Sequence, residues 1–161
     1  MSFDPLAILR RLAEAGVDFI VIGGVAAAVR GSPSATVDLD LCYAREEKNL
    51  RRLSSVLRAT SARLRGVTAA VPFLLDAETL GAGDHFTLST NLGDLDLLGT
   101  PAGTDGYDDL VRHATDVDLD GLTVKVASLD DLIRMKRAAG RAKDRIELEI
   151  LGALRDELEN R

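Results

Sequence analysis

Hydrophobic positions along the chain change period several times, which predicts a mixture of helices and strands. In residues 5–16 leucines recur at helical spacing, behind Ser2 and Asp4 as candidate helix caps. Residues 18–22 form a short apolar run that ends at a glycine pair, as a buried strand does. Residues 36–42 alternate the apolar Val37, Leu39 and Leu41 with Asp38 and Asp40, which predicts a strand with an apolar face and an acidic face.

The rest of the chain continues this mixed pattern. Asp120-Gly121 is the strongest hairpin signal, and Ser128 with Asp131 has the spacing of a capping box. Residues 60–83 show no clear period and are predicted to be a loop with short elements. Further helices are expected over residues 25–29, 45–59, 107–113, 128–139 and 143–158, and further strands over residues 85–89, 92–98, 117–119 and 122–126.

These elements do not follow a strict strand–helix–strand order. We therefore expect an α/β (α+β) fold with a mixed central sheet flanked by helices. The length of 161 residues favours a single domain over residues 1–161, with C-terminal helices from about 128 to 158.

The composition of the chain limits the cellular compartments and the classes of binding partner that we expect. No apolar stretch approaches the roughly 20 residues that span a bilayer, so no membrane segment is expected. The one cysteine, Cys42, excludes an internal disulfide and favours a reducing, cytoplasmic location. The net charge of −6 argues against non-specific nucleic-acid binding over the whole surface, but not against a local basic patch. Cys42, His85 and His113 are interpreted as structural, because no catalytic triad or zinc spacing is present.

The glycine pair Gly23-Gly24 stands where a strand is predicted to turn into a helix. Glycines there allow a ligand to approach the backbone, and the free N–H groups of the new helix favour an anion such as a triphosphate. A tight turn without a ligand explains the pair equally well.

Two acidic pairs recur in the same setting. Asp38 and Asp40 are two residues apart, so both carboxylates lie on one face of the predicted strand. Neighbouring carboxylates repel each other unless a cation screens them, and oxygen ligands of this kind suit Mg²⁺. Asp94 and Asp96 repeat the spacing, and three carboxylates around one or two Mg²⁺ ions could activate a hydroxyl and hold a phosphate. For each strand alone, a solvated acidic face is the alternative.

Residues 134–145 hold six cationic side chains in an otherwise acidic chain. Lys136 could reach a phosphate, with Asp144 to orient it, and the segment could guide a nucleotide or a tRNA end. Arg137, Arg141 and Arg145 would share one face only if a helix continued through residue 140, a glycine. A solvated amphipathic helix is the alternative.

Together these motifs resemble the nucleotidyltransferase superfamily of the DNA polymerase β type, and within it the small bacterial minimal-nucleotidyltransferase and AbiEii-toxin-like branch. The resemblance covers roughly residues 18–151. The motifs that carry it are Ile22-Gly23-Gly24, Gly31, Thr36-Val37-Asp38-Leu39-Asp40, Leu95-Asp96-Leu97-Leu98, Lys136 and Arg141-Ala142-Lys143-Asp144.

The resemblance implies a role for each matching residue. Asp38, Asp40 and Asp96 would be catalytic and would bind Mg²⁺ or Mn²⁺, with Asp96 as third ligand or as base. Asp96 is preferred to Asp94 because an apolar Leu pair follows it. Nucleotide contacts or their support would come from Gly23, Gly24, Thr36, Lys136, Arg141 and Asp144.

The implied activity is transfer of a nucleoside monophosphate from an NTP to a hydroxyl. The acceptor stays open among a protein, a tRNA and a small molecule. A toxin–antitoxin system with a cognate partner protein is also open.

Two alternatives stay open at the sequence level. Ser34 stands where relatives often carry Arg, so the chain could bind nucleotide weakly, use Arg30 instead, or be an inactive nucleotide- or partner-binding module. A phosphatase of the haloacid dehalogenase type also uses Asp-x-Asp after a strand. Such phosphatases usually carry Thr or Val at the position of Cys42, so this alternative is the least favoured of the three.

Overall fold

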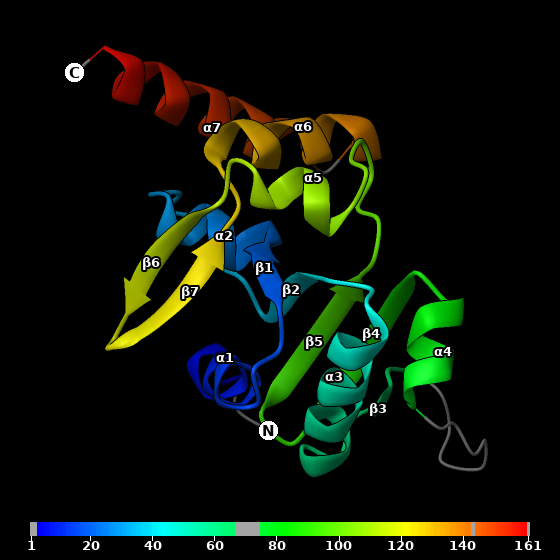
Figure 1. The fold of residues 1–161 in the computed structure, drawn as a ribbon. Helices are drawn as coiled ribbons and strands as arrows, with labels where there is room; N and C mark the ends of the chain where they lie inside the picture. The colour runs from blue at the N-terminus through cyan, green and yellow to red at the C-terminus, as the bar shows by residue number, and fades with distance from the viewer. Residues whose placement is uncertain (1–2, 67–74, 143, 161) are drawn as a thin grey trace.

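The structure of the chain is a computed structural model that describes residues 3–66, 75–142 and 144–160. Within these residues a seven-stranded mixed sheet has the order β3-β4-β5-β2-β1-β7-β6 (Figure 1). Its strands are β1 (Phe19–Ile22), β2 (Asp38–Tyr43), β3 (Arg63–Leu64), β4 (His85–Thr90), β5 (Gly93–Leu98), β6 (Thr115–Leu119) and β7 (Leu122–Val126). The helices are α1 (Pro5–Glu14), α2 (Gly23–Val29), α3 (Glu47–Ala59), α4 (Ala77–Ala82), α5 (Tyr107–Val111), α6 (Leu129–Ala139) and α7 (Asp144–Glu159). The predicted fold class is confirmed.

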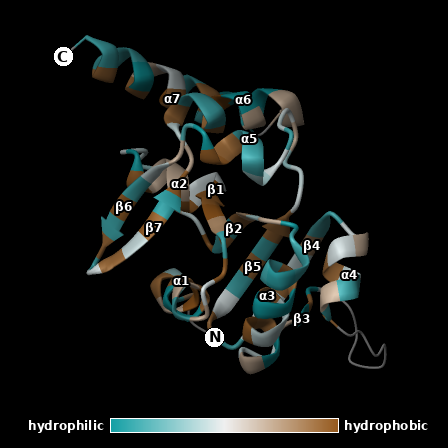
Figure 2. Ribbon diagram, in the orientation of Figure 1, coloured by the Kyte–Doolittle hydropathy of each residue, from teal (hydrophilic) through white to brown (hydrophobic). Residues whose placement is uncertain are grey.

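The centre of the sheet is its most apolar part. All four residues of β1 are buried, and β1 pairs antiparallel with β2 and parallel with β7. Figure 2 shows hydrophobic residues on β1 and hydrophilic stretches along the outer parts of α7. Because both neighbours of β1 are strands and helices cover the sheet, its continuous apolar run has no solvent-facing side.

The parallel pairing of β2 with β5 decides where the acidic residues lie. Its register places Asp38 beside Asp94 and Asp40 beside Asp96. The leucines between them are buried on the opposite face, as the period of two requires. Val37 was expected on that apolar face, and this expectation is wrong. Val37 is 78% exposed, because β2 begins only at the next residue.

Helix starts follow the predicted caps closely. Asp4 accepts a hydrogen bond from the Ala7 N–H at 3.0 Å, and Ser128 accepts one from the Asp131 N–H at 3.1 Å. These contacts satisfy N–H groups that have no partner inside the helix. The other candidate cap, Ser2, lies outside the described residues.

One helix begins earlier than predicted, and another ends where predicted. Helix α2 begins at Gly23, two residues early, so the glycine pair forms its first turn. Helix α6 ends at Ala139, as predicted, and is capped by Gly140, whose φ of 64° is left-handed, before α7 begins at Asp144. The arginines on either side of Gly140 therefore do not share one helical face. Lys143, the predicted start of the last helix, lies outside the described residues, as do residues 67–74 of the predicted loop.

The hairpin between β6 and β7 forms at its predicted turn, with positive φ at both Asp120 and Gly121. Among the described helices, none combines the length and the apolar character that crossing a membrane requires.

Candidate active site

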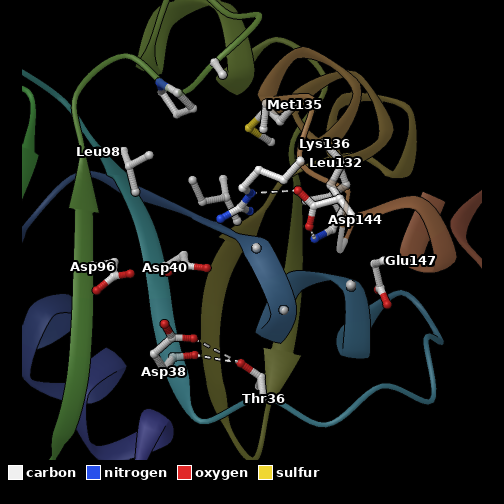
Figure 3. Close-up of a pocket in the computed structure, with 18 of the residues that line it drawn as sticks. Thr36, Asp38, Asp40, Asp96, Leu98, Leu132, Met135, Lys136, Asp144 and Glu147 are labelled. Atoms are coloured by element: carbon white, nitrogen blue, oxygen red, sulfur yellow. Dashed lines mark hydrogen bonds and ion pairs between the residues drawn. The ribbon is translucent and has the colours of Figure 1, made fainter. Parts of the chain in front are cut away.

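Three aspartates come together above the central sheet. Asp38 and Asp40 on β2 and Asp96 on β5 each offer a carboxylate oxygen, and these oxygens lie within 4.8 Å of one another. Figure 3 shows the three side chains projecting from the same side of the two strands. Asp94 is not part of this group; it lies beside Asp38 in the register, one pair away from Asp40. We call Asp38, Asp40 and Asp96 the cavity cluster.

The electrostatics of the cavity cluster are unfavourable for three free anions. Burial, and then the charges of Asp38 and Asp96, raise the pKa of Asp40 to about 7. Burial also raises the pKa of Asp96, although the cation of Arg65 opposes that rise. A divalent cation would offset this repulsion, and three converging carboxylate oxygens are the donor set that Mg²⁺ or Mn²⁺ takes. The residues present therefore fit such an ion.

The glycine pair is shaped by the side chains of the site. A Cβ on Gly23 would lie 2.0 Å from Oδ2 of Asp40, and the φ of Gly23 is +67°. A Cβ on Gly24 would lie 2.8 Å from Oγ1 of Thr36. Both glycines are thus required by close packing against these two side chains, a reason that the sequence alone did not reveal.

Thr36 holds the start of the acidic strand. Its hydroxyl donates to the main-chain oxygen of Asp38 at 3.0 Å and lies 3.4 Å from Oδ1 of the same residue (Figure 3). Thr36 was predicted as a nucleotide-binding residue. In the structure its hydroxyl contacts Asp38, so it braces the cavity cluster; because Thr36 also lines the cavity, its contact with a nucleotide stays a prediction.

Lys136, Arg141 and Asp144 form a second group across the cavity. Asp144, only 4% exposed, lies 3.3 Å from Nζ of Lys136 and 2.8 Å from Nε of Arg141. Burial alone would raise the pKa of Asp144, but the bonds from Arg141 and Lys136 outweigh it, and the pKa is lowered. Lys136 also lies near enough to Asp40 for its charge to oppose the rise in that pKa. The buried carboxylate thus holds the lysine at the cavity (Figure 3).

The loop before β2 carries the residue that departs from the family pattern. The Ser34 hydroxyl donates to Oε2 of Glu147 at 2.6 Å, and the Ser32 hydroxyl donates to Oε1 at 3.2 Å. Arg30 does not replace the missing arginine. Its guanidinium donates to the main-chain oxygens of Val126 and Ala127 on the β7 side, and Arg30 does not line the cavity described below, so the alternative that it holds phosphate is not supported.

One cavity of about 780 Å³ joins these groups. This volume is in the range of small-molecule sites. Its walls include every site residue predicted from the sequence: Gly23, Gly24, Thr36, Asp38, Asp40, Asp96, Lys136, Arg141 and Asp144. Leu98, Leu132 and Met135 add an apolar wall (Figure 3).

Two polar residues of this region were missed by the sequence analysis. Glu147 follows Asp144 by three residues, so helical spacing could have placed it on the same side of α7. Arg65 contacts Asp96 and lies in the stretch without clear period, where the sequence carries no signal for it.

No family model matches the chain, and no curated protein matches its sequence. Solved structures do match. The lincosamide antibiotic adenylyltransferase LnuA has a TM-score of 0.64 at 10% identity, covering 96% of this chain and 99% of that chain. A proposed nucleotidyltransferase from Thermotoga maritima has a TM-score of 0.58 at 18% identity, covering 98% and 91%. The antibiotic-resistance factor ANT(2'')-Ia has a TM-score of 0.57 at 15% identity, covering 97% and 89%.

The chain has the nucleotidyltransferase fold. At these identities the likeness establishes the fold, and the AbiEii-like branch stays a prediction. The nucleotidyltransferase fold leaves no support for the phosphatase alternative, which rested on Asp-x-Asp alone.

Proposed function

We propose that this protein is a divalent-metal-dependent nucleotidyltransferase that moves a nucleoside monophosphate from an NTP to a hydroxyl group. The observation that carries the proposal is the cavity cluster, three carboxylates held within 4.8 Å by two paired strands and facing a cavity that Lys136 also lines. Residues of perturbed pKa in a cleft are typical of functional sites.

We assign a separate role in the transfer reaction to each residue of the cavity. Asp38, Asp40 and Asp96 would hold Mg²⁺, which when bound neutralises phosphate charge and makes a coordinated hydroxyl more acidic. Lys136 binds a phosphate oxygen as a point charge, and Asp144 keeps its amino group in place. The acceptor oxygen attacks the α-phosphorus, the bond from that phosphorus to the bridging oxygen breaks, and pyrophosphate leaves. Asp96 accepts the proton of the acceptor hydroxyl.

We propose a small hydroxylated molecule as acceptor. Two structural neighbours are antibiotic-modifying enzymes by name: LnuA is a lincosamide adenylyltransferase seen with lincomycin, and ANT(2'')-Ia is seen with adenylyl-2''-tobramycin. They also favour ATP as the donor.

A tRNA acceptor is less well supported, because much of the basic segment is neutralised. Arg134 pairs with Asp109 at 3.1 Å and with Asp131 at 3.2 Å, and Lys136 and Arg141 both pair with Asp144. No contact among the described residues favours a cognate toxin or antitoxin protein over a small acceptor.

A nucleotide-binding module without turnover is the second candidate. It is favoured by Ser34, which stands where proteins with this motif often carry an arginine. The Ser34 hydroxyl donates a hydrogen bond to Glu147, so the position offers no cation for a phosphate.

A transfer assay separates the two candidates. ATP labelled at the α-phosphate is incubated with Mg²⁺, the protein and pools of hydroxylated small molecules, in parallel with tRNA. Label that moves to a small molecule in the wild type, but not in Asp38→Asn, supports the enzyme. Tight ATP binding with no transfer to any acceptor supports the module, and label on tRNA alone contradicts the small-molecule acceptor.

A further inference from the structure

We propose that Arg65 is a positioning residue that holds Asp96 in the orientation the transfer reaction needs. This inference rests on the proposed function and assigns a role to a residue outside the recognised motifs. Its basis is the way the Arg65 side chain connects the edge of the sheet to the third carboxylate.

The contacts of Arg65 are specific. Its Nη2 donates to Oδ1 of Asp96 at 2.8 Å and to the main-chain oxygen of Leu88 at 2.7 Å. Its Nε lies 3.3 Å from Oδ2 of Asp94. The guanidinium is therefore tied both to the backbone of β4 and to two carboxylates of β5. Fixing the planar group at several points restricts its motion, so the carboxylate it binds is restricted as well.

The backbone of Arg65 is anchored too. Its N–H donates to the main-chain oxygen of Thr87 at 2.9 Å, which extends the pairing of β3 with β4 by one residue. From this point the side chain crosses β4 and reaches Asp96, which sits beside Thr87 in the register of β4 and β5. Asp96 is the more enclosed partner, with 17% of its side chain exposed against 41% for Asp94.

The arrangement leaves Asp96 able to serve the cavity cluster. A carboxylate has two oxygens, and Arg65 binds Oδ1. Figure 3 shows one carboxylate oxygen of Asp96 directed toward Asp40. Arg65 thus fixes the outer side of the carboxylate and aims the other side at the place where ion and acceptor hydroxyl would meet. Groups that orient metal ligands in this way affect activity strongly without touching the substrate.

Arg63 provides a matched control. It lies on β3, two residues before Arg65, which directly follows that strand, and its side chain is exposed. No hydrogen bond or ion pair joins the Arg63 side chain to any residue that the structure describes. Arg63→Met therefore removes a cation from β3 without removing a contact to the cavity cluster.

The first test compares transfer kinetics of Arg65→Met, Arg65→Lys and Arg63→Met. We expect Arg65→Met to lower kcat by about 10- to 100-fold. The KM for ATP should change by less than about two-fold, because the residues assigned to the triphosphate lie elsewhere in the cavity. Arg65→Lys should recover part of the rate, since an ammonium can still reach Asp96, and Arg63→Met should match the wild type. The role is overturned if Arg65→Met raises the KM for ATP and leaves kcat unchanged, or if Arg63→Met lowers kcat as much as Arg65→Met does.

A second test does not depend on activity. Thermal unfolding of the metal-free protein is measured for Arg65→Met, Asp96→Asn and the double variant. If Arg65 holds Asp96, the effects are non-additive, and the double variant unfolds close to Arg65→Met alone. Additive shifts would show that the two side chains are not coupled and would overturn the inference. A wild type that neither binds ATP nor transfers label refutes the proposed function, while this cycle still decides whether Arg65 holds Asp96.

Discussion

Two groups of aspartates in this protein, one half-buried and one buried, have opposite electrostatic characters. In the cavity cluster, burial and like charges raise the pKa of Asp40 to about 7. By contrast, Asp109 of α5 accepts hydrogen bonds from the Asp105 N–H and from Arg112, both at 2.9 Å, and forms an ion pair with Arg134 at 3.1 Å. The Asp105 N–H, then Arg112 and Arg134, lower the pKa of Asp109. We call Asp109, Asp131, Arg112 and Arg134 the helix network.

This difference distinguishes a candidate ligand-binding site from a group whose role is structural. Asp109 is 6% exposed, and its charge is satisfied by donors from its own loop and from α6. It ties α5 to α6 and needs nothing further. The aspartates of the cavity cluster are half-buried, yet Arg65 is the one cation paired with their carboxylates among the described residues. An unbalanced group of carboxylates facing a cavity calls for a ligand, and burial alone does not.

The largest expected effect comes from removing a charge in the cavity cluster. Asp40→Asn should lower the rate of nucleotidyl transfer by about 1,000-fold, because stabilisation of developing charge is lost. The same change should leave the metal-free fold at least as stable, since it relieves repulsion. Transfer kinetics and thermal unfolding in EDTA check the two halves. If Asp40→Asn unfolds more easily than the wild type and still transfers the nucleotide at the normal rate, Asp40 is a structural residue and the comparison fails.

The matching change in the helix network should do the opposite. Asp109→Asn removes the negative charge that pairs with Arg112 and Arg134 and should lower the free energy of unfolding by about 1–3 kcal/mol, as expected for hydrogen bonds to charged groups. The transfer rate should fall by no more than a few-fold, because Asp109 does not line the cavity. Urea unfolding measures the first effect. Unchanged stability would show that the network is not a brace.

The pH dependence of stability should distinguish the two groups. The folded pKa of Asp40, about 7, lies above the unfolded value of about 3.9, so the native state binds more protons between these values. The contribution of Asp40 to the stability of the metal-free protein therefore falls as pH rises from about 4 to 7. The lowered pKa of Asp109 has the opposite sign, and its contribution is lost only as pH falls below about 4.

Urea unfolding in EDTA from pH 4.5 to 8 measures this slope in the wild type and in Asp40→Asn. The variant should lose less stability than the wild type as pH rises. Identical slopes in both proteins would contradict the assignment of the raised pKa to Asp40.

A smaller effect is expected at the glycine that packs on the cavity cluster. Gly23→Ala should cost about 1–3 kcal/mol, because alanine is strained at a φ of +67° and its Cβ would meet Oδ2 of Asp40. Gly152→Ala is the control, since a Cβ there has no described atom within 4 Å and alanine favours a helix by about 1 kcal/mol. Equal stability of both variants would contradict the close packing.

Much of the fold could be predicted because local signals agreed with the tertiary structure. The alternation around Asp38 and Asp40, the Asp120-Gly121 turn and the Ser128 cap each depend on neighbours in sequence, and each is seen in the structure. The gathering of Asp96 with the other two aspartates depends on the pairing of β2 with β5, which the sequence does not encode locally. It was anticipated from recurrence of the acidic pattern.

What could not be predicted depends on long-range contacts. Arg65 reaches Asp96 across a strand, from a stretch with no period, so no spacing rule identifies it. Arg30 was one alternative for the arginine that relatives often carry where Ser34 stands. The fold instead turns its guanidinium toward β7, where main-chain oxygens bind it.

The central claim is that the cavity cluster, and not the helix network, is a site for metal and nucleotide. Calorimetric titration with ATP, GTP, CTP and UTP, with and without Mg²⁺, tests it most directly in three proteins: wild type, Asp38→Asn and Asp109→Asn. We expect Mg²⁺-dependent nucleotide binding in the wild type and in Asp109→Asn, and its loss in Asp38→Asn. Binding that survives in Asp38→Asn, or no binding of any of the four nucleotides to the wild type, would contradict the account.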